Sequence, residues 1–447
     1  MRLSVACNFD PSLPKRLEGF PVYEVYGKLT ADPFGGGRPS FYLPKVDRKG
    51  VEQAVKDYHA RNIEFNYLLN ASCMANLEFS KQGQQKLRKM LDWLSEIGVD
   101  SITVGTLYFL KTIKRRYPHF KVRVSSHRYT DNARKARFWE DNGADCIVVS
   151  EVNIYREFEA LRAIRESVKC DLQLIVNNSC RQDCAIAANH ACSLSHASQD
   201  DEDRDRRSIP LDYSILFCLN YKLSEPINYL RANWIRPEDL HHYEAIGYEN
   251  FKIVERNTPT KILLERVNAY VNRSYDGNLL DLVQFFSYDE NKFSKREKDL
   301  FSLRRLLKYF MKPKAINLLK FAKVVDLGRT IGLLFPRTGE PGVYIDNKAL
   351  DGFIDRFLKQ GCQAMDCERC GYCQRWADKV VQIDPSYRDR ALGLFANVLD
   401  ELHDGSFWNS YMGTLVEPEP GRTSGFVKPY VEMVKYVAKK RSSQHPA

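Results

Sequence analysis

The sequence has no stretch of about 18 uninterrupted apolar residues, the length that a membrane-spanning helix needs. Its first residues, MRLSVACNFDPSLP, lack the basic and then apolar pattern of a secretory leader, so we expect a cytoplasmic protein. Cysteine is sparse, at 12 of 447 residues, which excludes a disulfide-scaffolded domain. Core packing alone needs fewer, so the spacing of the cysteines decides what they do.

No single sign of charge dominates the chain. Lys and Arg number 67 and Asp and Glu 57, which leaves a net charge of +10. This bias permits an anionic partner without requiring one. RNA is therefore a minor partner hypothesis, in which the basic segment at 112–123 and the tail at 435–444 would bind phosphates. The alternative is that these side chains lie on solvated outer helices.

Short apolar runs alternate with amphipathic segments from about residue 60 to residue 255, a rhythm that predicts βα units. With two earlier runs, the sequence predicts about eight strands and hence a (β/α)8 TIM-barrel-like domain, with an open doubly wound sheet as the alternative. The runs are RLSVACNF (2–9), PVYEVYGKL (21–29), IEFNYLLN (63–70), SITVGTL (101–107), VRVSS (122–126), ADCIVVS (144–150), LQLIVNN (172–178) and FKIVE (251–255).

The barrel pattern ends near residue 275. We therefore predict a barrel domain over 1–275 and a mostly helical, cysteine-rich accessory region over 276–447. The mixed-charge run QDDEDRDRRS (199–208) is expected to be a solvated loop, and the basic stretch at 295–312 is expected to be helical. Within the barrel, Gly98 should end one helix, and Thr130 or Asp131 should cap the N-terminus of the next, which runs to Asn142.

Functional residues of such barrels collect where the strands end at their carboxyl side, and polar residues occur at these positions here. We expect Asn70, Asn177 and Asn178 to hydrogen-bond a polar substrate, and Glu151 or Glu255 to move a proton. Two arginines are further substrate-binding candidates: Arg38, beside the glycines of GGGRP, and Arg236, which could clamp a carboxylate bidentately. The alternatives are that the asparagines cap strand ends and that Arg236 pairs with Glu238 or Asp239.

Four cysteines near the C-terminus follow the pattern C-x4-C-x2-C-x2-C: Cys362, Cys367, Cys370 and Cys373. Thiolates two or three residues apart can converge on one metal from a single tight turn, as an iron-sulfur cluster or zinc requires. The number of ligands does not distinguish an iron-sulfur cluster from zinc, because both accept four cysteines. The dense spacing favours iron-sulfur, with a 4Fe-4S cluster as the expected type and zinc as the alternative.

A second group, Cys180, Cys184 and Cys192, follows the predicted strand LQLIVNN directly, where a barrel places its active site. This group needs a fourth ligand. Cys218 is our main candidate, and the other candidates are His190, His196 and Cys73. The chain would then hold one or two iron-sulfur clusters.

Motifs for hydrolysis are absent from the sequence, which contains neither H-E-x-x-H nor G-x-S-x-G. A cysteine nucleophile would need a base, and His190, six residues after Cys184, is the candidate. Redox chemistry accounts for more of the cysteines, with one cluster at the barrel mouth and a second that relays electrons. Such chemistry would require an electron donor or a partner subunit.

Several segments together carry a family resemblance: VYGKLTADPFGGGRPSFYLP, NYLLNASCMAN, NNSCRQDC, WIRPEDLHHYEAIGYENFKIVER and the C-terminal cysteine pattern. This ordered set, over about residues 1 to 380, resembles peptidase family U32, the collagenase-like proteins, and is most similar to its cysteine-rich bacterial branch. The family's commoner E-x-F-x-H-G-A-x-C run is replaced here by VNNSCRQDC.

The resemblance implies a barrel-like N-terminal domain. It also implies kinship with iron-sulfur proteins that support oxygen-independent hydroxylation of ubiquinone precursors or of RNA bases, in which case Cys180, Cys184 and Cys192 would be cluster ligands. We therefore expect an iron-sulfur oxidoreductase that modifies a small molecule or peptide, with oxygen-independent hydroxylation as the candidate reaction. A collagenase-like peptidase and an RNA base-modifying protein are the alternatives.

Overall fold

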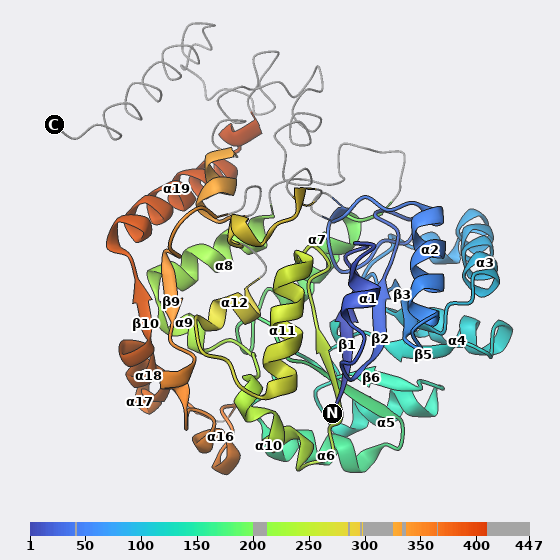
Figure 1. Ribbon diagram of the computed structural model, residues 1–447, viewed down its shortest axis with the longest axis horizontal. Coiled ribbons are helices and arrows are strands. Elements are labelled where there is room, and N and C mark those ends of the chain that lie inside the picture. The colour runs from blue at the N-terminus through green and yellow to red at the C-terminus, as the bar shows by residue number, and fades with distance from the viewer. Residues whose placement is uncertain are drawn as a thin grey trace, which may run out of the picture.

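The computed structural model describes residues 1–40, 43–199, 212–284, 287–295, 297, 325–332, 337–363 and 365–408. Eight parallel strands pair in chain order and close into a barrel, because β8 pairs with both β7 and β1 (Figure 1). The predicted (β/α)8 barrel is confirmed. The strands are β1 (Arg2–Ala6), β2 (Val22–Gly27), β3 (Glu64–Leu69), β4 (Ser101–Val104), β5 (Lys121–Val124), β6 (Cys146–Val148), β7 (Asp171–Ile175) and β8 (Asn250–Ile253).

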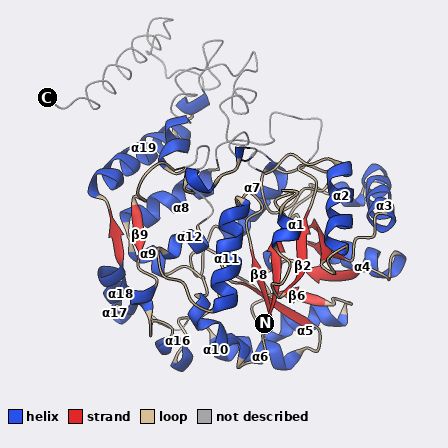
Figure 2. Cartoon of the chain, viewed as in Figure 1, coloured by secondary structure: helices blue, strands red, loops and turns tan. Residues whose placement is uncertain are grey.

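Helices connect the strands and cover the outside of the barrel (Figure 2). Their apolar faces pack on the strands, whose own apolar side chains form the other half of this core. They are α1 (Leu13–Arg16), α2 (Arg48–His59), α3 (Lys81–Glu96), α4 (Leu107–Arg116), α5 (Ala133–Asp141), α6 (Phe158–Ser167), α7 (Ala187–His196), α8 (Tyr213–Ser224), α9 (Ile227–Leu230), α10 (Leu240–Glu244) and α11 (Thr260–Asn272).

The helix ends follow the sequence signals, with one correction. Gly98 follows α3 with φ +80, a left-handed conformation that suits glycine. The N-cap of α5 is Asn132, and neither Thr130 nor Asp131. Asn132 has extended backbone angles, so its side chain accepts a hydrogen bond from the Lys135 amide, whereas the Asp131 carboxylate pairs with the Lys135 ammonium.

An ion pair lies inside the barrel. The Arg123 Nε atom of β5 is 2.6 Å from the Glu24 carboxylate of β2, and both side chains are fully buried. Two hydroxyl groups complete the carboxylate's hydrogen bonds, from Ser4 at 2.6 Å and from Ser101 at 3.1 Å. The pair thus ties β1, β2, β4 and β5 together from within.

The C-terminal region packs on one side of the barrel, against α8 and α9 (Figure 1). It shares a large hydrophobic cluster with the barrel. No described helix is long and apolar enough to cross a membrane. The predicted boundary at residue 275 falls between α11 and α12. The described elements are α12 (Leu279–Val283), β9 (Val343–Ile345), α16 (Asp355–Lys359), α17 (Cys367–Cys370), α18 (Tyr372–Val380), β10 (Val381–Ile383) and α19 (Pro385–His403).

Three segments with sequence-based predictions are not covered by the described residues. The mixed-charge run after residue 199, most of the basic stretch at 295–312 and the tail at 435–444 lie outside the described residues.

One glycine is expected to be indispensable for the packing of β4 on the loop after β3. A Cβ atom on Gly105 would lie 2.1 Å from the Ala71 carbonyl oxygen, which belongs to the backbone and cannot rotate away. We expect Gly105→Ala to lower the free energy of unfolding by about 1–3 kcal/mol, as measured by urea denaturation. Gly393→Ala in α19 is the control, since its Cβ meets nothing within 4 Å and should stabilise the helix by about 1 kcal/mol. An equal response of the two variants would contradict this reading.

Candidate functional site

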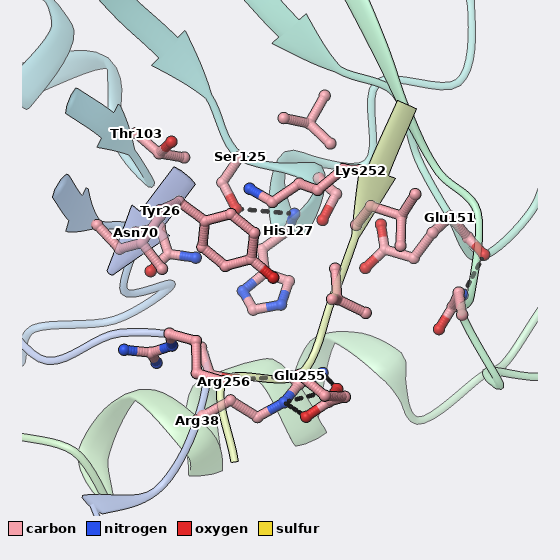
Figure 3. A pocket seen from close by; sticks show the side chains of 17 residues that line it. Tyr26, Arg38, Asn70, Thr103, Ser125, His127, Glu151, Lys252, Glu255 and Arg256 are labelled. Carbon is pink, nitrogen blue, oxygen red and sulfur yellow. Dashed lines mark hydrogen bonds and ion pairs between the residues drawn. The ribbon is translucent and has the colours of Figure 1, made fainter. Parts of the chain in front are cut away.

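A polar pocket lies at the carboxyl ends of the barrel strands (Figure 3). Five of the predicted site residues line it: Arg38, Asn70, Glu151, Asn178 and Glu255. They come from five different loops, after β2, β3, β6, β7 and β8, so the closure of the barrel brings them together. This is the end of the barrel at which enzymes of this fold carry their active sites.

Arg38 and Glu255 form an ion pair across the pocket. The guanidinium contacts both carboxylate oxygens, through Nε at 3.2 Å and through Nη2 (Figure 3). Glu255 has φ +92, an unusual angle for a residue with a side chain, and such strain is concentrated at functional sites. The Glu255 carboxylate is therefore held in place by both its backbone and Arg38.

The glycines before Arg38 let this loop approach the pocket closely. A Cβ on Gly37 would lie 2.6 Å from the His127 ring, and one on Gly36 would lie 3.2 Å from the Asn70 side chain. The loop is anchored by the buried Lys28–Asp32 ion pair at 2.9 Å. The GGGRP segment thus serves to place Arg38 at the pocket.

Glu151 has a carboxyl oxygen that is available to a ligand. It is buried, and its Oε2 atom has no hydrogen-bond partner among the described residues. Burial raises the pKa of this carboxyl group. Asn178 donates a hydrogen bond to the Glu151 carbonyl oxygen at 2.8 Å, and the buried Oδ1 atom of Asn70 lacks a partner within the described part of the chain.

Three charged or ionisable residues of the pocket escaped the sequence analysis: His127, Lys252 and Arg256. Burial and the positive charges of Arg38 and Arg128 lower the pKa of His127 to about 3, so this ring is neutral at physiological pH. Lys252 interrupts the buried strand β8 (NFKI), and a lysine inside a buried strand is the signal that could have revealed it.

The structure corrects two substrate-binding predictions. Asn177 is buried between β7 and β8, where its side chain bonds the backbone of Val254 in both directions, at 2.7 and 3.1 Å. Arg236 lies away from the pocket and bonds Asn347 at 3.1 Å and Asp351 at 2.5 Å. Neither residue lines the pocket, because backbone and C-terminal acceptors occupy their donors.

His190 also lies outside the pocket lining, on α7. Its Nε2 atom is 3.0 Å from the Asp212 carboxylate. This carboxylate orients the imidazole ring, as a partner of a general base does.

The first cysteine group lies beside the pocket. Cys180 follows Asn178, whose Oδ1 atom accepts a hydrogen bond from the Cys180 amide at 3.1 Å. Cys180 is partly exposed. The pKa of its thiol is nevertheless raised to about 12, mainly by desolvation within the surrounding protein and then by Glu151 and Cys218. Cys180 and Cys192 are both among the groups whose charge would raise the pKa of the Tyr129 hydroxyl group.

The C-terminal cysteines form a second neighbourhood, around α17 and the start of α18. Burial raises the pKa of Cys362 to about 11. Arg156 opposes this rise and Cys373 adds to it. Burial raises the pKa of Cys373, and Cys367 and Cys370 are among the neighbours that add to this rise. The Cys362 amide bonds the Glu157 carboxylate of the barrel at 2.5 Å, which fixes this segment against the βα loop after β6.

All twelve cysteines are free thiols, which suits them to metal binding. In the described ranges, however, no three His, Cys, Asp or Glu side chains converge as a closed metal site. The C-terminal thiols fit a cluster in number and kind. Cys184 and Cys192 were predicted as ligands with Cys180 and Cys218, and this set stays a prediction.

Known proteins resemble this chain in sequence. The model of peptidase family U32 matches residues 43–208. A protein of Methanocaldococcus jannaschii described as an uncharacterized protease is 26% identical over 370 residues, which cover 82% of this chain and 90% of that protein. A solved U32 peptidase is 21% identical, covers 57% of this chain and 93% of its own, and superposes with a TM-score of 0.42. The matched residues 43–208, which include Asn70, Glu151 and Cys180, are thus similar to peptidase family U32.

Proposed function

We propose that this protein is an iron-sulfur-dependent oxidoreductase that modifies a small polar molecule or peptide at the barrel mouth, with oxygen-independent hydroxylation as the reaction. The observation that carries the proposal is the position of Cys180. The Asn178 side chain bonds both the Cys180 amide and the Glu151 carbonyl oxygen, so this cysteine lies next to the pocket loop that carries Glu151. An iron-sulfur cluster bound there supplies one-electron transfer. Cys180, Cys184, Cys192 and Cys218 are the proposed ligands.

The chain's own residues would bind the substrate and move protons. The free Oδ1 atom of Asn70 accepts a hydrogen bond from a substrate hydroxyl or amide group. Glu151 is the proposed proton donor or acceptor, because its Oε2 atom has no protein partner in the described residues. Glu255 is paired with Arg38, so its proposed role is to hold that arginine toward an anionic group of the substrate.

The C-terminal cysteines are the proposed ligands of a second cluster or, alternatively, of zinc. A relay of electrons through this region would require a donor protein. RNA stays a minor candidate for the substrate, tested by salt-dependent binding of the purified protein.

Peptide hydrolysis is the second candidate function. The His190–Asp212 pair favours it, because an oriented imidazole can activate a cysteine such as Cys184. A thiolate that holds a cluster is not free to attack a peptide, so the two functions predict different outcomes in one experiment.

Anaerobic purification followed by iron and sulfide analysis tests the proposal. We expect about four or eight irons per chain with matching sulfide, and a charge-transfer absorption band. Cys180→Ser and Cys370→Ser should each remove part of the iron, and Cys170→Ser, which lies outside both groups, is the matched control. Zinc alone, or a folded and metal-free protein that cleaves peptides in a Cys184-dependent manner, would overturn the proposal.

A further inference from the structure

Lys252 differs from the other buried lysines of this protein. The Lys28 ammonium bonds the Asp32 carboxylate at 2.9 Å and the Gly35 carbonyl oxygen at 2.6 Å, and the Lys222 ammonium bonds the Ser179 carbonyl oxygen at 2.6 Å. Lys252 is only 6% exposed, yet its ammonium has neither a hydrogen bond nor an ion pair among the described residues. Its Nζ atom lies over the ring of Tyr26, 3.9 Å from the ring centroid.

The carboxylate deepest in the barrel does not neutralise Lys252. Glu24 already binds Arg123, Ser4 and Ser101. The other ionisable groups that act on Lys252 and its surroundings are Cys146 from β6, Arg256 from the loop after β8 and Glu151 from the loop after β6. Arg123 and Arg256 therefore share this space with Lys252, while Glu24 is fully engaged and burial raises the pKa of Glu151. This balance disfavours an ammonium ion.

The side chain of Lys252 faces the pocket. It lines the mouth together with Ser125 and Thr103, and it extends toward Tyr26 and Ser125 in Figure 3. Leu68, Val148 and Ile175 supply the apolar part of the lining. An unpaired amine beside apolar walls and hydroxyl groups is the arrangement in which lysine acts as a nucleophile toward carbonyl compounds.

Arg256 supplies a second feature of this site. It is 4% exposed, lines the same pocket, and has no hydrogen bond or ion pair to any described residue. The Glu255 carboxylate acts on Arg256 from a distance but is bonded to Arg38. A buried guanidinium with no bonded protein anion favours a carboxylate ligand. The site therefore combines a nucleophilic amine with a cation for an acidic group.

We propose that Lys252 forms a Schiff base with the carbonyl group of a small oxo acid, whose carboxylate is bound by Arg256. The amine nitrogen attacks the carbonyl carbon, so a C–N bond forms and the C=O π bond breaks to give a carbinolamine. The hydroxyl group of this adduct then leaves as water, and a protonated imine remains. From the ammonium form the step balances as R2C=O + Lys–NH3⁺ → R2C=NH⁺–Lys + H2O, with no oxidant or reductant.

The reaction is favoured near neutral pH. Burial, opposed by Glu24 and reinforced by Arg123, lowers the pKa of Lys252 to about 8. At pH 8 about half of this amine is neutral, against under about 1% for an ordinary lysine. The fraction of reactive neutral amine at Lys252 should therefore be about a hundred times that of a surface lysine.

Reductive trapping tests the proposal on the purified full-length protein, loaded with metal or free of it, since the inference does not rest on the cysteines. The protein is incubated at pH 8 with pyruvate or levulinate and sodium cyanoborohydride, and the adduct is located by mass spectrometry of peptides. We expect one dominant adduct, on Lys252, and its loss in Lys252→Arg and Lys252→Met. Lys222→Arg should leave it unchanged.

A further variant tests the carboxylate site. Arg256→Gln should weaken trapping of both oxo acids but leave trapping of acetone, which has no carboxylate. Adducts spread over surface lysines, or the same adduct pattern in the Lys252 variants, would overturn the proposal. Lys252→Met is included because it keeps the barrel packed even if the arginine variant fails to fold.

Discussion

Glu24→Gln is expected to lower the free energy of unfolding by about 3–5 kcal/mol, the largest loss that we predict for a single substitution. The change leaves the Arg123 guanidinium buried inside the barrel without its carboxylate, 2.6 Å away in the native protein. An unpaired buried charge costs far more than the pair contributes, because water cannot reach it. Urea denaturation followed by circular dichroism measures the effect.

Glu64→Gln is the matched control for this experiment. Glu64 also lies on a barrel strand and pairs with Lys121 at 2.7 Å, but the Lys121 side chain is 56% exposed. Solvent screens this pair, so its loss should cost about 1 kcal/mol or less. Similar costs for Glu24→Gln and Glu64→Gln would show that the interior of the barrel is hydrated and that the buried pair has no special weight.

Lys252→Met, unlike Glu24→Gln, is expected to raise the free energy of unfolding, by about 3 kcal/mol at pH 7. The same substitution should abolish trapping of oxo acids. Burial lowers the pKa of Lys252 to about 8 in the folded protein, from an ordinary value of 10.5. The unfolded chain therefore binds a proton more readily than the folded chain between these values. Methionine has a similar length and no charge to bury.

The pH dependence of this gain provides a second measurement. In the wild type, the free energy of unfolding should rise between pH 8 and about pH 10.5. In this range Lys252 is mostly neutral in the folded protein but still protonated in the unfolded chain, so raising the pH removes a proton that favours unfolding. The difference between Lys252→Met and the wild type should therefore be full below pH 8 and shrink above it. A difference that is constant with pH, or a destabilised variant, would refute this account. A residue that costs stability and faces a pocket is the pattern expected of a functional group.

Much of the fold could be predicted from the sequence. All eight apolar runs are strands, because a strand covered on both faces must be apolar along most of its length. Gly98 ends its helix as expected, whereas the cap of α5 at Asn132 was misplaced by one or two residues. Caps depend on backbone angles at single residues, which the pattern of apolar side chains does not determine.

The site could be predicted less completely. Arg38, Asn70, Glu151, Asn178 and Glu255 were found because they follow strands, and each lines the pocket. Asn177 was selected by the same rule but turns to the backbone of Val254. Lys252 was missed because it lies within a strand, where lysine was treated as part of an apolar run.

The sequence by itself determined the strand order of a barrel, the end of the barrel that carries polar groups, and the two cysteine patterns, because each depends on local spacing along the chain. Only the tertiary structure decided which side chains share a space. Barrel closure placed Arg123 against Glu24 and left Lys252 without a carboxylate, and the docked C-terminal region engaged Arg236. These outcomes depend on contacts between residues far apart in sequence, and the charge that each buried group carries depends on those contacts.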